Sequence, residues 1–170
     1  GVFVETCTYT IVWDTDKDYE KMTEPKDLDF GIKAEELTVQ YLKQKYPNTK
    51  RVTGYNKGFD IDIVDINKTA EVKYDRQTDG PDAKTGNLFI ECKSRTAPSG
   101  IETTTADIWF YWYSSLNKVV SFEPSVIKDM IKKYGYRKVR GGDSSTSVGY
   151  LIPVKLLEEK QKERMNNVKS

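Results

Sequence analysis

The sequence contains no histidine, only two cysteines (Cys7 and Cys92) and no long hydrophobic run. Without histidine and with so few cysteines, neither a zinc site nor a disulfide framework is expected. Any metal should therefore be bound by oxygen atoms, as Mg²⁺, Mn²⁺ and Ca²⁺ are. No apolar segment approaches the ~20 residues that a membrane-spanning helix needs, and a signal-peptide pattern is absent from the first residues. A cytoplasmic location is therefore expected.

The length of 170 residues and the hydrophobic content of 37% are enough for one domain with its own core. The formal net charge of +1 does not by itself indicate a partner of opposite charge, but the charges are unevenly placed. Residues 1–30 hold eight acidic residues against three lysines, whereas residues 126–170 hold eleven lysines or arginines against five acidic residues. A local basic surface is compatible with nucleic-acid binding. A solvated helix face explains the basic C-terminal segment equally well.

The patterning predicts an α/β or α+β domain with a central mixed β-sheet flanked by helices. A helix is expected over residues 30–46, capped by Asp29 and stopped by Pro47. Strands are expected over residues 8–13, 51–55, 59–65, 69–75 and 88–93, with a strand pair over 107–113 and 118–124. A second helix from Pro124 to about Tyr134, a hairpin over 139–154 and a charged terminal helix complete the chain.

Two consecutive predicted strands, over residues 59–73 (FDIDIVDINKTAEVK), carry an unusual concentration of charge. If Asn67 and Lys68 form a two-residue turn, Asp62 faces Lys73. Side chains alternate along a strand, so four ionisable groups are then expected on one face of the sheet. These groups are Asp60, Asp62, Glu71 and Lys73. For the hairpin taken alone, an exposed strand pair with an ordinary cross-strand ion pair is slightly favoured.

The predicted helix over residues 30–46 changes that balance. At about 100° per residue its apolar residues cover one broad side, and Glu35 projects within that side, whereas Glu36 falls among lysines. A carboxylate that faces the interior is costly unless its charge is compensated. Glu35 is therefore predicted to point over the acidic face and to help hold a metal or a water. The alternative is a boundary glutamate that extends outward to solvent.

These residue types suit phosphodiester hydrolysis. That reaction needs a water made nucleophilic, charge neutralised on the phosphate and a stabilised leaving oxygen, which hard cations held by carboxylates supply. A neighbouring lysine adds positive charge at the phosphoryl oxygens and orients or deprotonates the water. A Glu-X-Lys sequence such as Glu71-Val72-Lys73 delivers a ligand and a lysine to the same face of one strand.

The order of these residues resembles the PD-(D/E)xK nuclease superfamily, and especially its phage-type members. The carrying motifs are Glu35 on a helix, Asp60 or Asp62 on one strand and Glu71-Val72-Lys73 on the next, followed by the runs TGNLFIE and PSGIETTTAD. The resemblance covers residues 31–153. It implies a restriction-endonuclease-like core there, between an acidic N-terminal extension of residues 1–30 with one strand and a charged C-terminal helix over 154–170.

The resemblance further implies Mg²⁺ or Mn²⁺ as cofactor. The implied ligands are Asp60, Asp62 and Glu71, with Lys73 and Glu35 completing the catalytic set. No proline precedes the aspartate here, and two acids compete for that position. Asp60 fits the start of the strand better than Asp62. A second Glu-X-Lys, Glu91-Cys92-Lys93, is interpreted as ordinary sheet-surface charge in which Glu91 is an alternative support for the site.

Other segments carry weaker indications. Thr103, Thr104, Thr105 and Asp107 resemble a segment that packs near the active site in similar sequences, but a helix or strand cap is the preferred interpretation. The aromatic run over residues 109–113 is interpreted as core and a possible dimer face rather than a base-stacking surface. Candidates for contacts with nucleic-acid phosphates are all basic. They are Arg76, Lys84, Arg95, Arg137, Lys138 and Arg140.

The leading hypothesis is thus a metal-dependent endonuclease that hydrolyses DNA, in the cytoplasm of the host if it is phage-encoded. A junction resolvase and a restriction or recombination endonuclease are two versions of it, and structure-selective cutting would need a homodimer. RNA is an alternative substrate. The contrasting hypothesis is a catalytically inactive nuclease-fold module that binds nucleic acid or a partner protein.

Overall fold

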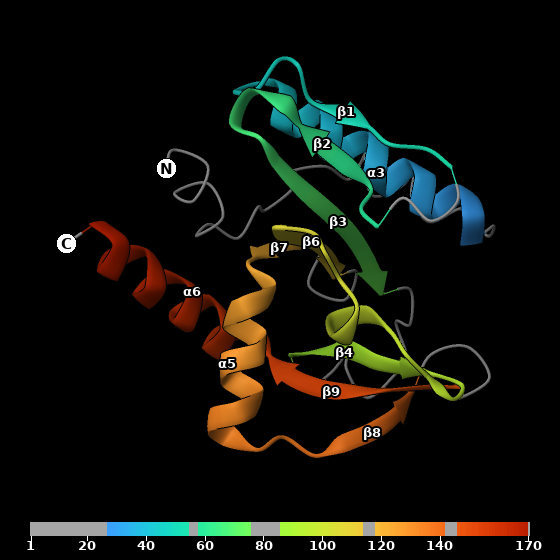
Figure 1. The fold of residues 1–170 in the computed structure, drawn as a ribbon, viewed down its shortest axis with the longest axis vertical. Coiled ribbons are helices and arrows are strands. Elements are labelled where there is room, and N and C mark those ends of the chain that lie inside the picture. Colours follow the sequence, from blue (N-terminus) through green and yellow to red (C-terminus); the bar gives the residue numbers. More distant parts are fainter. Residues whose placement is uncertain (1–26, 55–57, 76–85, 114–117, 142–145, 170) are drawn as a thin grey trace.

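The computed structural model describes residues 27–54, 58–75, 86–113, 118–141 and 146–169 (Figure 1). The predicted strand over residues 8–13 lies outside these ranges. The helices described are α3 (Asp27–Lys43), α5 (Pro124–Tyr134) and α6 (Val154–Lys169). They confirm a mixed α and β architecture, and none of the helices in the described ranges has the length and apolarity needed to cross a membrane.

One sheet is mixed and has the strand order β1-β2-β3-β6-β7. Its strands are β1 (Lys50–Arg51), β2 (Ile61–Ile63), β3 (Lys68–Asp75), β6 (Ile108–Tyr113) and β7 (Lys118–Phe122). β3 and β6 run parallel, whereas the other neighbours run antiparallel. The predicted mixed sheet and the predicted strand pair of β6 and β7 are therefore confirmed.

A second sheet, which the sequence patterning did not separate from the first, has the order β5-β4-β9-β8. Its strands are β4 (Asn87–Ser94), β5 (Ala97–Pro98), β8 (Lys138–Gly141) and β9 (Ser147–Pro153), all paired antiparallel. Figure 1 shows β4, β9 and β8 as a layer apart from β1, β2 and β3. The predicted hairpin over residues 139–154 corresponds to β8 and β9.

The mixed sheet separates two hydrophobic cores. On one face, α3 contributes Ala34 and Leu42 to a cluster with Ile61 and Val72 of the strands. We call the other cluster the inter-sheet core; it lies between the mixed sheet and the second sheet and is closed by α5 and α6. Its members include Trp109, Tyr111 and Phe122 from the first sheet, Ile90, Tyr150 and Ile152 from the second, and Ile127 and Leu157 from the helices.

The pairing of β2 with β3 differs from the predicted register. The chain forms a 3₁₀ turn over Val64–Ile66, and Asn67 adopts a left-handed conformation with φ 52°, so that Asp62 pairs with Thr69 instead of Lys73. The predicted two-residue turn at Asn67 and Lys68 is therefore wrong. The predicted partner of Asp62 is wrong by an even number of residues, and side chains alternate between the two faces of a sheet with a period of two. For that reason the predicted shared face of Asp62, Glu71 and Lys73 survives the correction.

A short connection over residues 97–107 joins the second sheet to the first. It contains β5 and a 3₁₀ turn over Gly100–Glu102 that packs against β4. Gly100 has φ +54°, and a Cβ placed on it would lie 2.2 Å from the carbonyl oxygen of Glu91. Only glycine meets both constraints, because it tolerates positive φ and brings no side chain to this close approach.

Replacing Gly100 by alanine is therefore expected to lower the free energy of unfolding by about 2–5 kcal/mol. Of this, roughly 1–2 kcal/mol comes from the left-handed conformation and 1–3 kcal/mol from the clash with β4. Gly135 is a matched control, because its φ is +63° but a Cβ there meets nothing within 4 Å. Gly135→Ala should cost about 1–2 kcal/mol in urea unfolding, and equal costs for both variants would contradict the close approach at Gly100.

Candidate active site

Asp60, immediately before β2, lies close to Glu71 of β3. The backbone N–H of Asp60 donates to the carbonyl of Ala70 at 2.9 Å, and Ile61 is the cross-strand partner of Ala70. The Asp60 carboxylate lies close enough to Glu71 to raise the pKa of Glu71. The Asp60 Oδ2 atom accepts a hydrogen bond from the backbone N–H of Val72 at 2.8 Å. The carboxylate of Asp60 is thus fixed against the strand that carries Glu71.

Glu71 is a charged group in a largely enclosed position. Only 19% of its side chain is exposed, and its Oε1 atom lies 3.6 Å from the Nζ atom of Lys73. Burial raises the pKa of Glu71, the Lys73 ammonium lowers it, and the Asp60 carboxylate raises it again, with a net upward shift. A carboxylate that is desolvated beside a second carboxylate is a group that a divalent cation would stabilise.

Thr104, on the connection between the sheets, contacts Glu71 directly. Its Oγ1 atom donates to Glu71 Oε2 at 3.1 Å and accepts from the Trp109 indole at 3.0 Å. Lys73 Nζ lies 5.4 Å from the centroid of the Trp109 ring, which is the geometry of a cation–π contact. The cap interpretation of residues 103–107 missed this contact, because Thr104 precedes β6 but reaches the neighbouring strand.

The other members of that segment contact nearby backbone groups, and one of them, Asp107, caps a strand. Asp107 Oδ2 accepts from the backbone N–H of Thr69 at 2.9 Å, at the start of β3. The Thr105 hydroxyl donates to the carbonyl of Gly58 at 3.3 Å, and the Thr103 hydroxyl faces the carbonyl of Gly100 at 3.5 Å. The connection is therefore tied to β3 and to the segment before β2.

Asp62 shares the face of Asp60 but lies farther from Glu71. Its cross-strand partners are Lys50 and Thr69. A residue displaced by two positions from the directly opposite pair is separated by about 7–8 Å between Cα atoms. Of the two competing aspartates, Asp60 is the one that bonds the neighbouring Val72 N–H and raises the pKa of Glu71.

Glu35 lies on the other side of the sheet from Glu71. Its Oε2 atom is 3.9 Å from the Nε atom of Arg51. Arg51 is the cross-strand partner of Ile61, and partners point to the same face, which here is the face covered by α3. The charge of Glu35, which the sequence analysis expected to be compensated, is thus paired with Arg51, and the structure does not bring Glu35 together with Glu71 and Lys73.

The two charged residues of the second Glu-X-Lys sequence lie in different environments. The Glu91 carboxylate accepts hydrogen bonds from the Ser99 hydroxyl at 2.9 Å and from the Ser147 hydroxyl at 2.5 Å. It thereby joins β4 to β9 and to the segment after β5. Lys93 is exposed and lies two residues further along β4. Glu91 therefore supports the second sheet rather than Glu71.

The basic candidates are concentrated on the second sheet. Arg76 and Lys84 lie outside the described residues, whereas Arg95, Arg137, Lys138 and Arg140 are exposed. Lys93 and Arg140 are both cross-strand partners of Val148, so they lie on one face with Lys138. A cleft of about 360 Å³ opens there. Its lining residues are Cys92, Lys93, Thr96, Pro98, Glu102, Lys138 and Val148.

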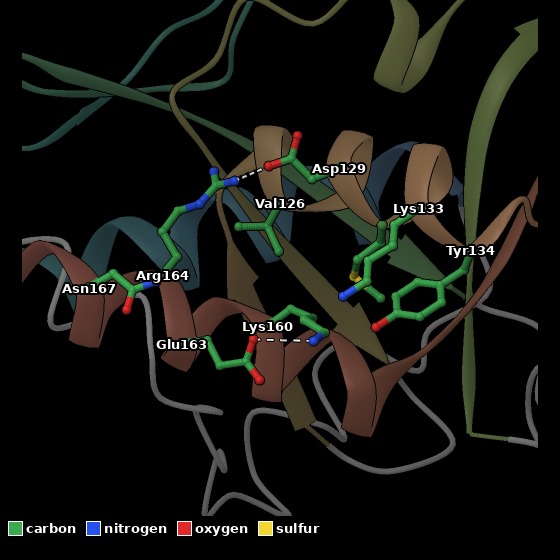
Figure 2. A pocket seen from close by; sticks show the side chains of 9 residues that line it. Val126, Asp129, Lys133, Tyr134, Lys160, Glu163, Arg164 and Asn167 are labelled. Atoms are coloured by element: carbon green, nitrogen blue, oxygen red, sulfur yellow. Dashed lines mark hydrogen bonds and ion pairs between the residues drawn. The ribbon is translucent and has the colours of Figure 1, made fainter.

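The aromatic run and the terminal helices have structural roles. Residues 109–112 are all buried, so this part of the run belongs to the cores, and these side chains are not available for the expected dimer face. A cavity of about 540 Å³ between α5 and α6 is lined by apolar, polar and charged residues, and some of the charged residues pair with one another (Figure 2). Lys160 bonds Glu163 at 3.2 Å, and Arg164 pairs with Asp129. This cavity is separate from Glu71.

A divalent cation such as Mg²⁺ requires several oxygen ligands. Within the described ranges there is no group of three Asp, Glu, His or Cys residues arranged to hold a metal. Asp60 and Glu71 form a pair, and Mg²⁺ usually keeps several waters and is bound by one or two carboxylates together with phosphate oxygens. The pair therefore fits Mg²⁺ or Mn²⁺ that is shared with a phosphate-bearing substrate, and not a closed site made of protein ligands alone.

Comparison with protein-family models, with curated proteins and with solved structures finds no match to this chain. A functional proposal therefore rests on the geometry described above.

The raised pKa of Glu71 predicts a specific pH dependence of stability in the presence of chelator. A carboxyl group whose pKa is higher in the folded than in the unfolded protein contributes stability at pH values below its ordinary pKa of 4.5. That contribution is lost as the pH rises through the pKa of the folded state. Glu71→Gln should therefore be more stable than the wild type at pH 8, with the difference shrinking toward pH 4 in urea unfolding.

Glu159→Gln is the matched control for this experiment, because Glu159 is exposed on α6. It should change the stability little at either pH. If Glu71→Gln is less stable than the wild type at pH 8, the carboxylate of Glu71 is not destabilised in the empty protein.

Proposed function

We propose that the protein is a divalent-metal-dependent nuclease that hydrolyses DNA phosphodiester bonds, and that its core has the restriction-endonuclease-like fold. One observation carries the proposal. The Asp60 carboxylate accepts from the backbone N–H of Val72 and lies close enough to Glu71 to raise its pKa, and Lys73, two residues along, is 3.6 Å from the Glu71 carboxylate. The order of a helix, antiparallel strands bearing an acid and then Glu-X-Lys, and a parallel strand supports the fold.

Asp60 and Glu71 would hold the cation, Mg²⁺ or Mn²⁺. When bound, such an ion neutralises charge on the phosphate and lowers the pKa of a coordinated water. Oδ2 of Asp60 accepts from the Val72 N–H, which holds the carboxylate beside β3. Asp62, farther along the same face, would reach the ion only through a water. Glu35 is left out of this proposed set because it pairs with Arg51.

Lys73 provides the positive charge that the chemistry needs on the protein side. In hydrolysis the water oxygen forms a bond to phosphorus, the bond from phosphorus to one sugar oxygen breaks, and that oxygen takes up a proton. The ammonium of Lys73 stabilises the negative charge on the phosphoryl oxygens and orients the attacking water. Its contact with the buried Trp109 ring restricts where the flexible lysine stem can point.

The basic cleft on the second sheet is the proposed contact for the nucleic-acid backbone. Both the cleft and the acidic pair border the inter-sheet core: Glu71 is the partner of Trp109, and Lys138 is the partner of Tyr150. A strand of DNA that places one phosphate at Glu71 would find cations of the second sheet along its path. Arg95, Arg137 and Arg140, together with Arg76 and Lys84, are proposed as further phosphate contacts.

A binding-only module is the second candidate. The observation that favours it is the lack of a third ligating carboxylate near Asp60 and Glu71 within the described ranges. The retained pair of repelling carboxylates beside a lysine favours the enzyme, because binding alone gives no reason to keep two negative charges together. RNA as substrate, and a homodimer that cuts branched DNA, are versions of the proposal that the same assays separate.

Cleavage should require the metal and the three site residues. We expect the protein to cut at least one of supercoiled, linear, single-stranded or four-way-junction DNA, or RNA, with Mg²⁺ or Mn²⁺ and not with chelator. Asp60→Asn, Glu71→Gln and Lys73→Ala should each reduce the rate by at least about 10²-fold, because each removes a ligand or a charge needed in the transition state. Gel assays of initial rates measure this.

Lys128→Ala is the control for Lys73→Ala, since Lys128 is exposed on α5, and it should cut like the wild type. Binding without cleavage on every substrate and with both metals would reject the enzyme in favour of the binding-only module. Cleavage that persists in Lys73→Ala alone would contradict the role given to Lys73, and cleavage that persists in all three variants would indicate a contaminating nuclease.

The basic cleft generates a separate prediction about binding. In chelator, the variant Lys93→Ala/Lys138→Ala should bind DNA more weakly than the wild type. The slope of log K against log salt should be less steep by about 1–2, because each lost phosphate contact removes about one released counterion. Lys128→Ala/Lys162→Ala, which removes two exposed lysines from α5 and α6, is the matched control. Equal slopes for both double variants would place the DNA elsewhere.

A further inference from the structure

We infer that Thr104 is the residue that positions the Glu71 carboxylate for the cation, with Trp109 fixing the direction of the Thr104 hydroxyl. This inference rests on the proposed function, because it assigns a role within the same site. It concerns a residue outside the Asp60, Glu71 and Lys73 set, on a connection that comes from the other sheet.

The hydrogen-bond capacity of Thr104 allows only one direction for its proton. A threonine hydroxyl has one donor and two acceptor lone pairs. The Trp109 indole N–H donates to Oγ1 at 3.0 Å, and the backbone N–H of Ala106 donates to it at 3.3 Å. Both lone pairs of Oγ1 therefore accept from N–H groups, and these groups cannot accept the hydroxyl proton in return. The hydroxyl proton is left for Glu71 Oε2, which lies 3.1 Å away.

The partners that set this direction are themselves rigid. Trp109 is 1% exposed and packs against Phe122 with ring centroids 5.9 Å apart. Its position in β6, as the partner of Glu71 in β3, is fixed by the parallel pairing of the two strands. A donor held by a buried indole can orient a carboxylate without moving when the charge state of the site changes.

The two oxygens of Glu71 therefore have different partners. Oε2 accepts from Thr104, and Oε1 faces Lys73 at 3.6 Å. With Oε2 anchored, the carboxylate cannot rotate freely about its terminal bond, and Oε1 stays directed toward the Lys73 side of the site. Residues that orient a metal ligand in this way typically change metal affinity or activity by 10–100-fold when they are replaced.

The inference is tested by titrating the metal-free protein with Mg²⁺ alone in a calorimeter. Thr104→Val keeps the branched shape but removes the hydroxyl, and it should weaken Mg²⁺ binding about 10–100-fold. Thr104→Ser retains the hydroxyl and should bind within about threefold of the wild type, because it keeps the same three hydrogen bonds. Thr105→Val is the matched control, since the Thr105 hydroxyl contacts Gly58 and not Glu71.

A spectroscopic readout reports on the site without activity. The indole N–H resonance of Trp109, assigned by its loss in Trp109→Phe, should be broadened by paramagnetic Mn²⁺ in the wild type and in Thr104→Ser. Thr104→Val should need a 10–100-fold higher Mn²⁺ concentration for the same broadening, and in cleavage assays a correspondingly higher Mg²⁺ concentration for half the maximal rate. Thermal melting confirms that each variant is folded.

The outcomes separate the inference from the proposed function. If the wild type binds neither metal and cuts no substrate, the proposed nuclease fails and the inference fails with it. If the wild type binds metal and Thr104→Val binds it equally well, the positioning role alone is overturned. The same holds if Thr105→Val loses as much affinity as Thr104→Val, because a general loosening of the connection would then explain both.

Discussion

The carboxylate of Glu71 is held where only a fifth of its side chain reaches solvent, beside a second carboxylate and against the core between two sheets. The surrounding polar groups are arranged around this one charge. Lys73 supplies a cation, Thr104 donates a hydrogen bond, and Asp60 adds the like charge that makes a metal favourable. Such a position costs stability in the empty protein, and a bound cation would recover it. The proposed function follows from this cost of enclosing the Glu71 carboxylate without a cation.

The faces of β2 and β3 could be predicted from sequence even though their register could not. Alternation fixes which side chains share a face, and it tolerates any even error in pairing. The turn geometry depends on finer balances: Asn67 takes the left-handed conformation, but after a 3₁₀ turn instead of within a two-residue hairpin. The consequence is chemical, because Asp60, which precedes β2, is held against β3 by its bond to Val72 and lies close to Glu71.

The sequence could not predict how the strands and connections are arranged relative to one another. Local patterns indicate strands over β4 and β9, but nothing in them says that these strands leave the first sheet and form a second one. The contact of Thr104 with Glu71 spans 33 residues of sequence and depends on how the connection crosses between the sheets. The only local signal was the cluster of threonines, which a cap explains equally well.

Glu35 shows why the amphipathic pattern of a helix does not identify a site by itself. The pattern correctly placed Glu35 within the apolar side of α3, and that side packs on the sheet. A sheet has two faces, however, and Glu71 and Lys73 point away from the one that α3 covers. The cost of enclosing Glu35 is offset locally by Arg51, which belongs to the edge strand β1 and shares the α3 face. An inward carboxylate on a helix therefore needs a partner, and the strand register decides whether that partner is a metal site or an arginine.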